Sequence, residues 1–193
     1  MNATGTKKTG RRITTAAYAL PRILRTMTIK IGDRLPDATL SESTSFGEFC
    51  PDAPESVSVA DAVKGKRVVV FGVPGAFTPT CSAQHVPGFL ASHDAIKAKK
   101  VDEIWCIATN DGFVMAAWGK AENAMGKIRF LGDGSADFTK KLGLVLDLTA
   151  RGMGVRSQRF SMLVDDGIVK QLNVEPGPGF EVSGAETILK QLG

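Results

Sequence analysis

Cys81 is the side chain in this sequence that is best placed to do chemistry. An apolar run ends at Pro74, a short loop rich in proline and threonine follows, and an amphipathic helix is predicted to begin at Cys81. A cysteine at a helix N-terminus faces unpaired backbone N–H groups and the positive end of the helix dipole, and both favour thiolate over thiol. The sequence around Cys81 therefore predicts a nucleophile, although most lone cysteines are buried structural residues.

A nucleophilic thiolate also needs hydrogen-bond donors aimed at its target and a fixed cation nearby. Thr78, three residues before Cys81, can bring its hydroxyl beside the sulfur across one turn, and Pro74 stiffens the loop. The cation must come from far along the chain, and the candidates are Arg151, Arg156 and Arg159. Arg159 opens a predicted strand, which holds a guanidinium more rigidly than a loop would.

Composition limits the classes of protein to be considered. A chain of 193 residues with 43% hydrophobic and 23% charged residues suits one soluble domain with a substantial core. No apolar run approaches the ~20 residues that span a bilayer, so we expect no membrane partner. The three cysteines (Cys50, Cys81 and Cys106) are too few for a disulfide framework. They indicate a reducing compartment, which we take to be the cytoplasm.

The net charge of +4 is concentrated near the N-terminus. Residues 1–32 hold seven of the 24 basic groups and no acidic group, whereas the remaining 17 basic groups are outnumbered by 20 acidic ones. The mildly acidic body argues against nucleic-acid binding. We interpret residues 1–27 as a basic, disordered extension, or as residues that precede a true start at Met27. The alternative is a mitochondrial transit peptide over residues 1–26, since this stretch is basic and free of acid. The folded domain is then 28–193.

The pattern of apolar runs predicts an α/β fold. Strands are expected at 29–40, 57–59, 67–73, 101–109 and 128–131, and as a hairpin of 159–164 with 168–174 around an Asp-Gly turn. Helices are expected at 81–99 with a kink at Pro87, after Asp111 with Phe113 and Trp118 on the packed face, at 136–141 and at 184–191. Residues 152–154 read as a flexible loop. A central mixed β-sheet flanked by helices, as in the thioredoxin-like fold, accommodates this order.

The segment around Cys81, together with three further strings, resembles a known family. The pattern Pro74-x-x-x-Thr78-x-x-Cys81 matches the active-site pattern of the peroxiredoxins, and GVPGAFTPTCSAQHVPGF resembles their type II, peroxiredoxin-5-like subfamily. The strings TNDGFVMAAWGKA, QRFSMLVDDGIV and LNVEPG resemble it too, so the resemblance covers about residues 28–193. It implies a thioredoxin fold and reduction of hydrogen peroxide and alkyl hydroperoxides through a cysteine sulfenic acid. It also implies that Cys81 is the peroxidatic cysteine, with Thr78, Pro74 and Arg159 as hydroxyl partner, shield and cation.

The thiol that reduces the sulfenic acid is either a second cysteine of this chain or an external thiol. Animal members of the subfamily carry a resolving cysteine near the position of Val182 here, and valine cannot take that role. Cys106 matches the second cysteine of plant and many bacterial members, which often accept electrons from glutaredoxin and glutathione. Cys106 is therefore a candidate resolving cysteine, or else a buried structural thiol, because it lies in an apolar strand. The expected reductant is glutaredoxin with glutathione, or thioredoxin, and Cys50 is interpreted as incidental.

Two other functions stay open at this stage. A thioredoxin-like disulfide reductase is disfavoured, because the chain has no C-x-x-C pair. A redox-sensing or chaperone-like binding module controlled by Cys81 oxidation is the non-enzymatic alternative. We expect neither cofactor nor metal, since two histidines without a C-x-x-C make a poor ligand set. His85 lies one turn after Cys81, where it can touch the site, but it is interpreted as a structural or solvent-facing imidazole. The resemblance also implies a homodimer packed near the active-site loop and the Asp111–Phe113 turn.

Overall fold

The computed structural model of the chain describes Met1 and residues 28–193. The predicted extension over 1–27 and the alternative transit peptide lie outside the described residues, except for Met1. The predicted domain, 28–193, lies within them. In this part of the chain no helix is both long enough and apolar enough to cross a membrane.

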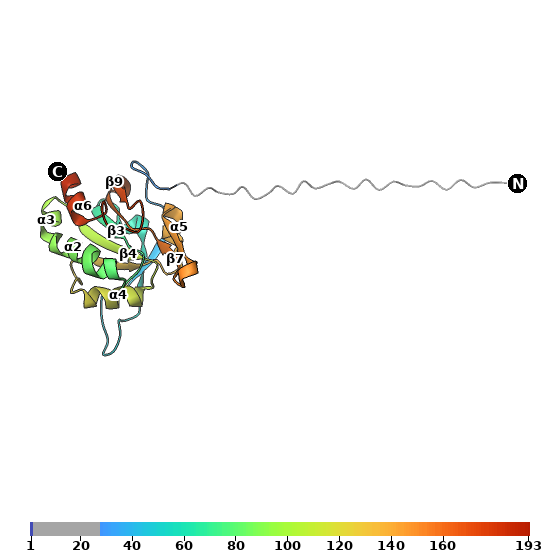
Figure 1. Ribbon diagram of the computed structural model, residues 1–193, viewed down its shortest axis with the longest axis horizontal. Coiled ribbons are helices and arrows are strands. Elements are labelled where there is room, and N and C mark those ends of the chain that lie inside the picture. The colour runs from blue at the N-terminus through green and yellow to red at the C-terminus, as the bar shows by residue number, and fades with distance from the viewer. Residues whose placement is uncertain (2–27) are drawn as a thin grey trace.

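A mixed sheet forms the centre of the domain (Figure 1). It has seven strands in the order β2-β1-β5-β4-β3-β8-β9. The central strands β3, β4 and β5 are parallel, and the outer pairs are antiparallel. The strands are β1 (Thr39–Glu42), β2 (Glu55–Ser58), β3 (Arg67–Gly72), β4 (Glu103–Ala108), β5 (Arg129–Gly132), β8 (Phe160–Asp165) and β9 (Ile168–Val174). This architecture confirms the predicted α/β fold with a central mixed sheet.

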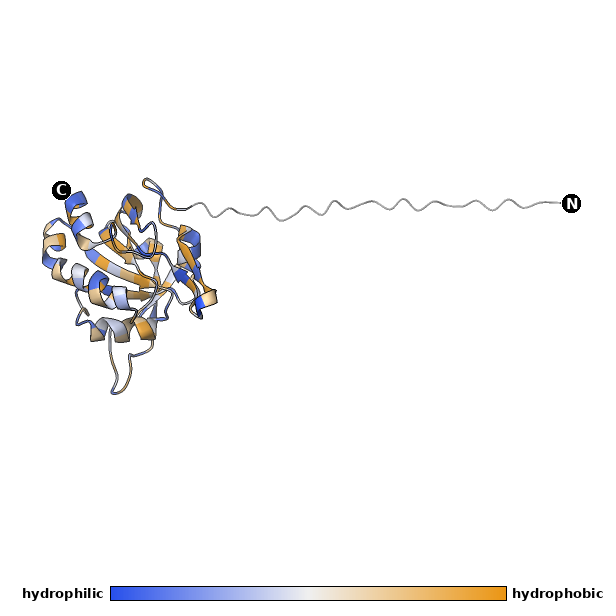
Figure 2. Cartoon of the chain, in the orientation of Figure 1, coloured by the Kyte–Doolittle hydropathy of each residue, from blue (hydrophilic) through white to orange (hydrophobic). Residues whose placement is uncertain are grey.

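Both faces of the sheet are covered, which explains why the central strands β3 and β4 are apolar after their first residue (Figure 2). Val69 and Phe71 of β3 face one core, and Val68 and Val70 face the other, as the two-residue period of a strand requires. The first core packs against α2 (Val86–Ala91), α3 (His93–Ala98), α4 (Gly112–Ala121) and α6 (Ala185–Leu192). The second packs against α1 (Val59–Ala62) and α5 (Asp137–Leu142).

The helix predicted over 81–99 is three shorter segments. A π-helical turn covers Cys81–His85 and leads directly into α2, and the chain breaks again at Ser92 before α3. The irregularity therefore precedes Pro87 instead of falling on it. Pro87 has no N–H and its ring would crowd the carbonyl four residues earlier, so a widened turn before it relieves the clash. The Val86 N–H bonds to the Cys81 carbonyl, which is the five-residue spacing of a π-turn.

The helix predicted after Asp111 is confirmed, but its packed face was predicted incorrectly. The Asp111 carboxylate accepts a hydrogen bond from the Val114 N–H and caps α4, as expected. Met115 and Trp118 are buried against the sheet, whereas Phe113 is 47% exposed. The small residues of α4 allow its close approach to the sheet: a Cβ at Gly119 would lie 2.6 Å from the Phe130 ring.

Two further elements differ from the prediction. The strand expected over 29–40 is reduced to an isolated bridge between Arg34 and Ile168, and β1 begins only at Thr39. Gly32, with φ of +92°, and Pro36 interrupt any ladder before it. The loop expected at 152–154 is present at Gly152 and Met153, but it joins two strands that were not predicted, β6 (Val145–Leu148) and β7 (Gly154–Ser157), which form a second sheet with a 3₁₀ turn at Thr149–Arg151 between them.

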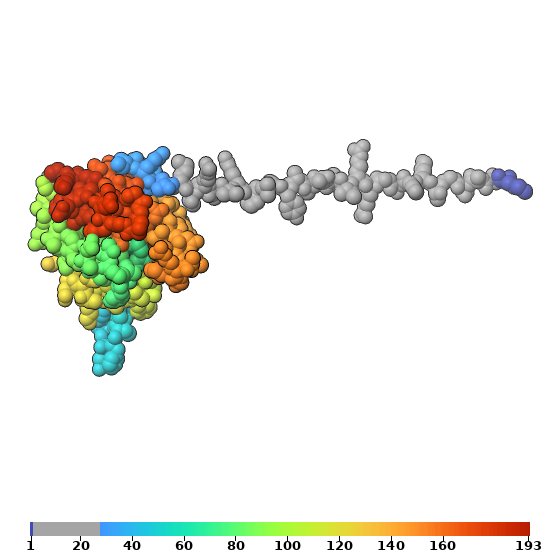
Figure 3. All heavy atoms as spheres, in the orientation of Figure 1, coloured from blue at the N-terminus to red at the C-terminus, as the bar shows by residue number. Residues whose placement is uncertain are grey.

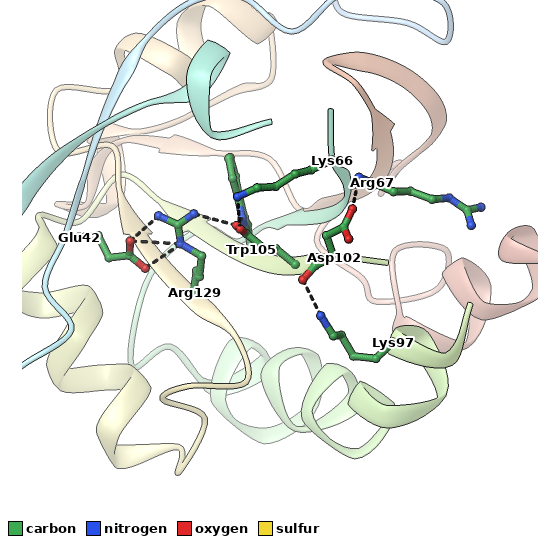
Figure 4. Close-up of polar contacts among 8 residues, drawn as sticks. Glu42, Lys66, Arg67, Lys97, Asp102, Trp105 and Arg129 are labelled. Atoms are coloured by element: carbon green, nitrogen blue, oxygen red, sulfur yellow. Dashed lines mark hydrogen bonds and ion pairs between the residues drawn. The ribbon is translucent and has the colours of Figure 1, made fainter. Parts of the chain in front are cut away.

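A network of charged side chains joins the ends of the strands at the sheet edge where β3, β4 and β5 begin (Figure 4). Arg129 donates to Glu42 from Nε at 3.0 Å and to Glu103 from Nη1 at 2.7 Å. Glu103 also accepts hydrogen bonds from Lys66 and from the Trp105 indole. Burial alone would raise the pKa of Glu103, but these donors lower it to about 2.

The loop of residues 43–54 projects from the body between β1 and β2 (Figure 3). An isolated bridge pairs Phe46 with Pro51 across the loop, and Phe49 and Cys50, which lie between them at its tip, are exposed. The loop thus places Cys50 at the surface, whereas Cys81 is buried in the core.

Candidate active site

Cys81 lies just beyond the carboxyl end of β3, where parallel sheets usually hold their ligands. The loop between β3 and Cys81 is fixed to the neighbouring β4–α4 turn, because the Ala76 N–H donates to Asn110 Oδ1 at 2.9 Å. A Cβ at Gly75 would lie 2.7 Å from Arg156 Nη1, so a larger residue there would displace this guanidinium. Phe77 has a positive φ of 58°, a strained conformation for an aromatic residue. The loop is therefore a constrained segment.

Thr78 contacts the sulfur as the sequence predicts. Its Oγ1 lies 2.8 Å from Cys81 Sγ and 2.9 Å from the Gly75 carbonyl oxygen. A hydroxyl has one hydrogen, so it cannot donate to both at once. When Cys81 is a thiol, its S–H donates to Oγ1 and Thr78 donates to Gly75. When Cys81 is a thiolate, the hydroxyl is free to turn toward the sulfur.

Arg159 is the arginine that the fold brings to Cys81. Its Nη2 lies 3.5 Å from Cys81 Sγ, and the side chain is buried. The antiparallel pairing of Gly72 with Phe160 places the residue before β8 beside the loop that follows β3. Within residues 28–193 no carboxylate forms a salt bridge with Arg159. Its charge is therefore available to the sulfur.

The other two candidate arginines do not contact the sulfur. Arg156 donates to the Met153 carbonyl at 2.7 Å and to the Pro74 carbonyl at 3.3 Å, so it holds the loop that precedes Cys81 in place. Arg151 lies exposed at the 3₁₀ turn. The contact between Arg156 and the Pro74 carbonyl oxygen was not predicted, because the sequence indicated a role only for the proline ring.

His85 belongs to the site, an outcome that the sequence left open but did not favour. It is fully buried, its Nδ1 lies 3.1 Å from Arg159 Nη1, and its Nε2 lies 3.1 Å from the Ser183 carbonyl oxygen. Burial and the Arg159 charge lower its pKa to about 3, so the imidazole is neutral at physiological pH. A histidine one turn after the nucleophile, on an otherwise apolar helix, was the available signal.

Cys106 lies in the centre of β4, paired in register with Phe71 and Phe130. It is fully buried, and burial together with the neighbouring Cys81 raises its pKa well above the ordinary value. At neutral pH Cys106 is therefore a thiol, which is the poorly nucleophilic form. Both Cys81 and Cys106 are free cysteines.

Among residues 28–193, no three His, Cys, Asp or Glu side chains come close enough together to hold a metal ion. Around Cys81 the arrangement is instead one sulfur, one hydroxyl and one guanidinium in a largely apolar core. Such a site suits a reaction in which a thiolate attacks a small polar molecule.

Comparison with known proteins identifies the family. The model of the Redoxin family matches residues 30–189. Peroxiredoxin-2B of Arabidopsis thaliana is 50% identical over 164 residues, which cover 85% of this chain and 98% of the plant protein. The chain belongs to the peroxiredoxins. This peroxiredoxin is accordingly a thiol peroxidase.

Solved structures agree with the assignment. Reduced Prx3 of Vibrio vulnificus, in complex with hydrogen peroxide, superposes with a TM-score of 0.80 at 49% identity, covering 86% of this peroxiredoxin and 100% of that chain. Peroxiredoxin 5 of Alvinella pompejana gives a TM-score of 0.73 at 34% identity, covering 85% and 97%. The resemblance predicted from the sequence strings is therefore confirmed, and the fold is that of the thioredoxin-like peroxiredoxins.

Proposed function

We propose that Cys81 reduces hydrogen peroxide and alkyl hydroperoxides with Thr78 and Arg159 as its partners, and that an external glutathione-type thiol completes the cycle. The observation that carries the proposal is the convergence of two donors on one sulfur: Thr78 Oγ1 at 2.8 Å and Arg159 Nη2 at 3.5 Å. The similar Vibrio vulnificus protein has been solved in complex with hydrogen peroxide, which supports the substrate class.

The first half of the cycle oxidises the sulfur. The Cys81 thiolate attacks one peroxide oxygen and the O–O bond breaks. That oxygen stays on the sulfur as a sulfenic acid, while the other takes a proton and leaves as water or an alcohol. Arg159 and Thr78 donate hydrogen bonds to the peroxide oxygens as negative charge moves onto them. Pro74 offers no N–H that would draw water toward the sulfur.

The second half of the cycle reduces the sulfenic acid. Glutathione condenses with it to give a mixed disulfide and water, and a second thiol, from glutaredoxin or glutathione, releases Cys81. The raised pKa of the buried Cys106 supports an external thiol, since a resolving cysteine must react as a thiolate. Resolution by Cys106 and reduction by thioredoxin are the competing routes.

Turnover with different reductants tests the proposal. Peroxide consumption is measured with glutathione plus glutaredoxin and, separately, with thioredoxin and its reductase. We expect faster turnover with the glutathione system, and loss of turnover in Cys81→Ser. Mass spectrometry after one equivalent of peroxide and glutathione should find the adduct on Cys81. Full activity in Cys81→Ser would refute the proposal, and a preference for thioredoxin would replace the reductant.

We further propose a homodimer that packs near the active-site loop. Phe77 of this loop is 58% exposed, and Phe113 at the start of α4 is 47% exposed. The ring centroids of Phe77 and Trp118, which also belongs to α4, lie 6.4 Å apart. Exposed aromatic residues of this kind favour an interface. Phe113→Ser should shift the sedimentation of the protein toward the monomer. Ile31→Ser, at an equally exposed apolar residue beside β9, is the control and should leave it unchanged.

We also propose the cytoplasm as the location, with mitochondrial import as the alternative if residues 1–26 are a transit peptide. The scarcity of cysteines supports a reducing compartment. A fluorescent fusion of the full chain, compared with one that begins at Met27, separates the two. Mitochondrial fluorescence that depends on residues 1–26 would favour the alternative.

A further inference from the structure

A closed ring of hydrogen bonds begins and ends at Arg159. The Arg159 guanidinium contacts His85 Nδ1, and His85 Nε2 contacts the Ser183 carbonyl, each at 3.1 Å. The Ser183 N–H and hydroxyl both donate to Glu175 Oε1, at 2.8 and 2.7 Å. The Glu175 N–H then donates to the Arg159 carbonyl at 2.9 Å. Four residues on three separate segments thus fix one another.

We infer that Glu175 is a positioning residue for the peroxidase reaction, which holds the Arg159 guanidinium on Cys81 through Ser183 and His85. This inference rests on the proposed function, because it assigns Glu175 a role in the step that Arg159 assists. Glu175 does not contact the sulfur.

The Glu175 carboxylate is the anchor of the segment that carries Ser183. Residues 175–184 form neither helix nor strand, so no regular ladder fixes their path. Glu175 Oε1 instead accepts the consecutive N–H groups of Glu181, Val182 and Ser183, at 3.0, 2.9 and 2.8 Å. The same segment brings Phe180 over the site, with its ring 4.8 Å from the His85 ring and 5.8 Å from Arg159 Cζ.

The donors and acceptors of the ring permit one arrangement of protons. A backbone carbonyl only accepts, so His85 Nε2 carries the hydrogen; a guanidinium only donates, so His85 Nδ1 is bare. His85 must therefore be neutral, and its lowered pKa of about 3 agrees with this. The charged groups that face it are Arg159, which lowers this pKa, and Glu175, which raises it. A displaced Ser183 carbonyl would free His85 to adopt the other tautomer, which cannot accept from Arg159.

The ring also explains why the carboxylate does not pair directly with the arginine. A bidentate carboxylate on Arg159 would compete with the thiolate and the peroxide for the same N–H groups. Placed behind Ser183 and His85, Glu175 orients the guanidinium and leaves Nη2 directed to Cys81 Sγ. The other oxygen of Glu175, Oε2, is buried and has no hydrogen-bond partner among the described residues, so the geometry is maintained at a cost to the carboxylate itself.

The test compares Glu175→Gln with a matched variant, Asp133→Asn. Asp133 is also buried and anchors a segment through the N–H groups of Phe138 and Thr139, but it takes no part in the ring. Stopped-flow oxidation of the reduced protein by hydrogen peroxide is recorded over a range of pH. We expect Glu175→Gln to slow oxidation on the order of tenfold and to move the rate profile to higher pH, because a misplaced cation assists the thiolate less. Asp133→Asn should lower stability and leave both unchanged.

Two results would overturn the inference, and the first needs no variant. In the unmodified protein, nitrogen-15 spectra of His85 should show a neutral ring protonated at Nε2 from neutral pH down to about pH 4. A ring that titrates near its ordinary value, or that is protonated at Nδ1, contradicts the ring of hydrogen bonds. Equal rates and pH profiles in Glu175→Gln and Asp133→Asn do so as well. If Arg159→Ala is slow while Glu175→Gln is not, only this inference fails; if Cys81→Ser still turns over, the proposed function fails.

Discussion

Arg159 Nη2 lies 3.5 Å from Cys81 Sγ, and no salt bridge within residues 28–193 neutralises this buried guanidinium. A cation in a water-poor site acts on nearby charge more strongly than the same cation in water. The pair therefore couples the ionisation of the thiol to the stabilisation of the peroxide oxygens as the O–O bond breaks. Both effects depend on the position of one side chain.

Arg159→Ala should slow the oxidation of Cys81 by hydrogen peroxide by about a hundredfold or more, the usual loss when one donor to a developing anion is removed. The oxidation rate of Arg159→Lys should lie between those of Arg159→Ala and the unmodified protein, because lysine keeps the charge but not the planar set of donors that reaches both sulfur and His85. Stopped-flow tryptophan fluorescence measures the rate, and urea unfolding measures any loss of stability. Equal oxidation rates in all three proteins would remove Arg159 from the site.

Thr78→Val should slow the same step on the order of a hundredfold, since valine has nearly the shape of threonine but offers no hydroxyl to the sulfur. Thr78→Ser keeps the hydroxyl and serves as the matched control, with a rate close to that of the unmodified protein. Far-ultraviolet circular dichroism checks that both variants fold. If valine and serine gave the same rate, the hydroxyl would have no part in the reaction.

The sequence predicts the local half of this site better than the distant half. Thr78 and Cys81 are three residues apart at a helix start, so their contact follows from helical geometry. Arg159 reaches the sulfur only because β8 pairs antiparallel with β3, and that pairing is a property of the whole sheet. Without the family resemblance, three arginines were candidates and Arg159 was only the preferred one.

The parts of the fold that escaped prediction were decided by tertiary contacts. Phe113 is apolar and was placed on the packed face of α4, but the sheet accepts the face that carries small residues such as Gly119. His85 gave too weak a signal, because its role is set by Ser183, which lies 98 residues away. The helix is irregular one turn before Pro87, where the kink is predicted, because the widened π-turn forms on the N-terminal side of the proline.

Cys106→Ser should retain the turnover of the unmodified protein with glutathione and glutaredoxin, if an external thiol reduces the Cys81 sulfenic acid. The reason is that burial of Cys106 in β4 raises its pKa and keeps it in the protonated, poorly nucleophilic form. Steady-state peroxide consumption is the measurement, and Cys50→Ser is the control at an exposed cysteine. A large loss of turnover in Cys106→Ser alone, with an intramolecular disulfide in the oxidised parent protein, would assign Cys106 the resolving role.

Glu103 should make the stability of the protein depend on acid. Its folded-state pKa of about 2 lies below the ordinary value of 4.5, because donors from Lys66, Arg129 and Trp105 outweigh the effect of burial. A lowered pKa gives stability that is complete above about pH 4.5 and is lost as the pH falls toward 2. Urea unfolding of Glu103→Gln at pH 5 and at pH 3 should therefore show roughly 1 kcal/mol less acid-induced loss than the parent protein, a value reduced for partial exposure. Glu48→Gln, at an exposed position in the 43–54 loop, should lose stability in parallel with the parent; a parallel loss in Glu103→Gln would contradict the prediction.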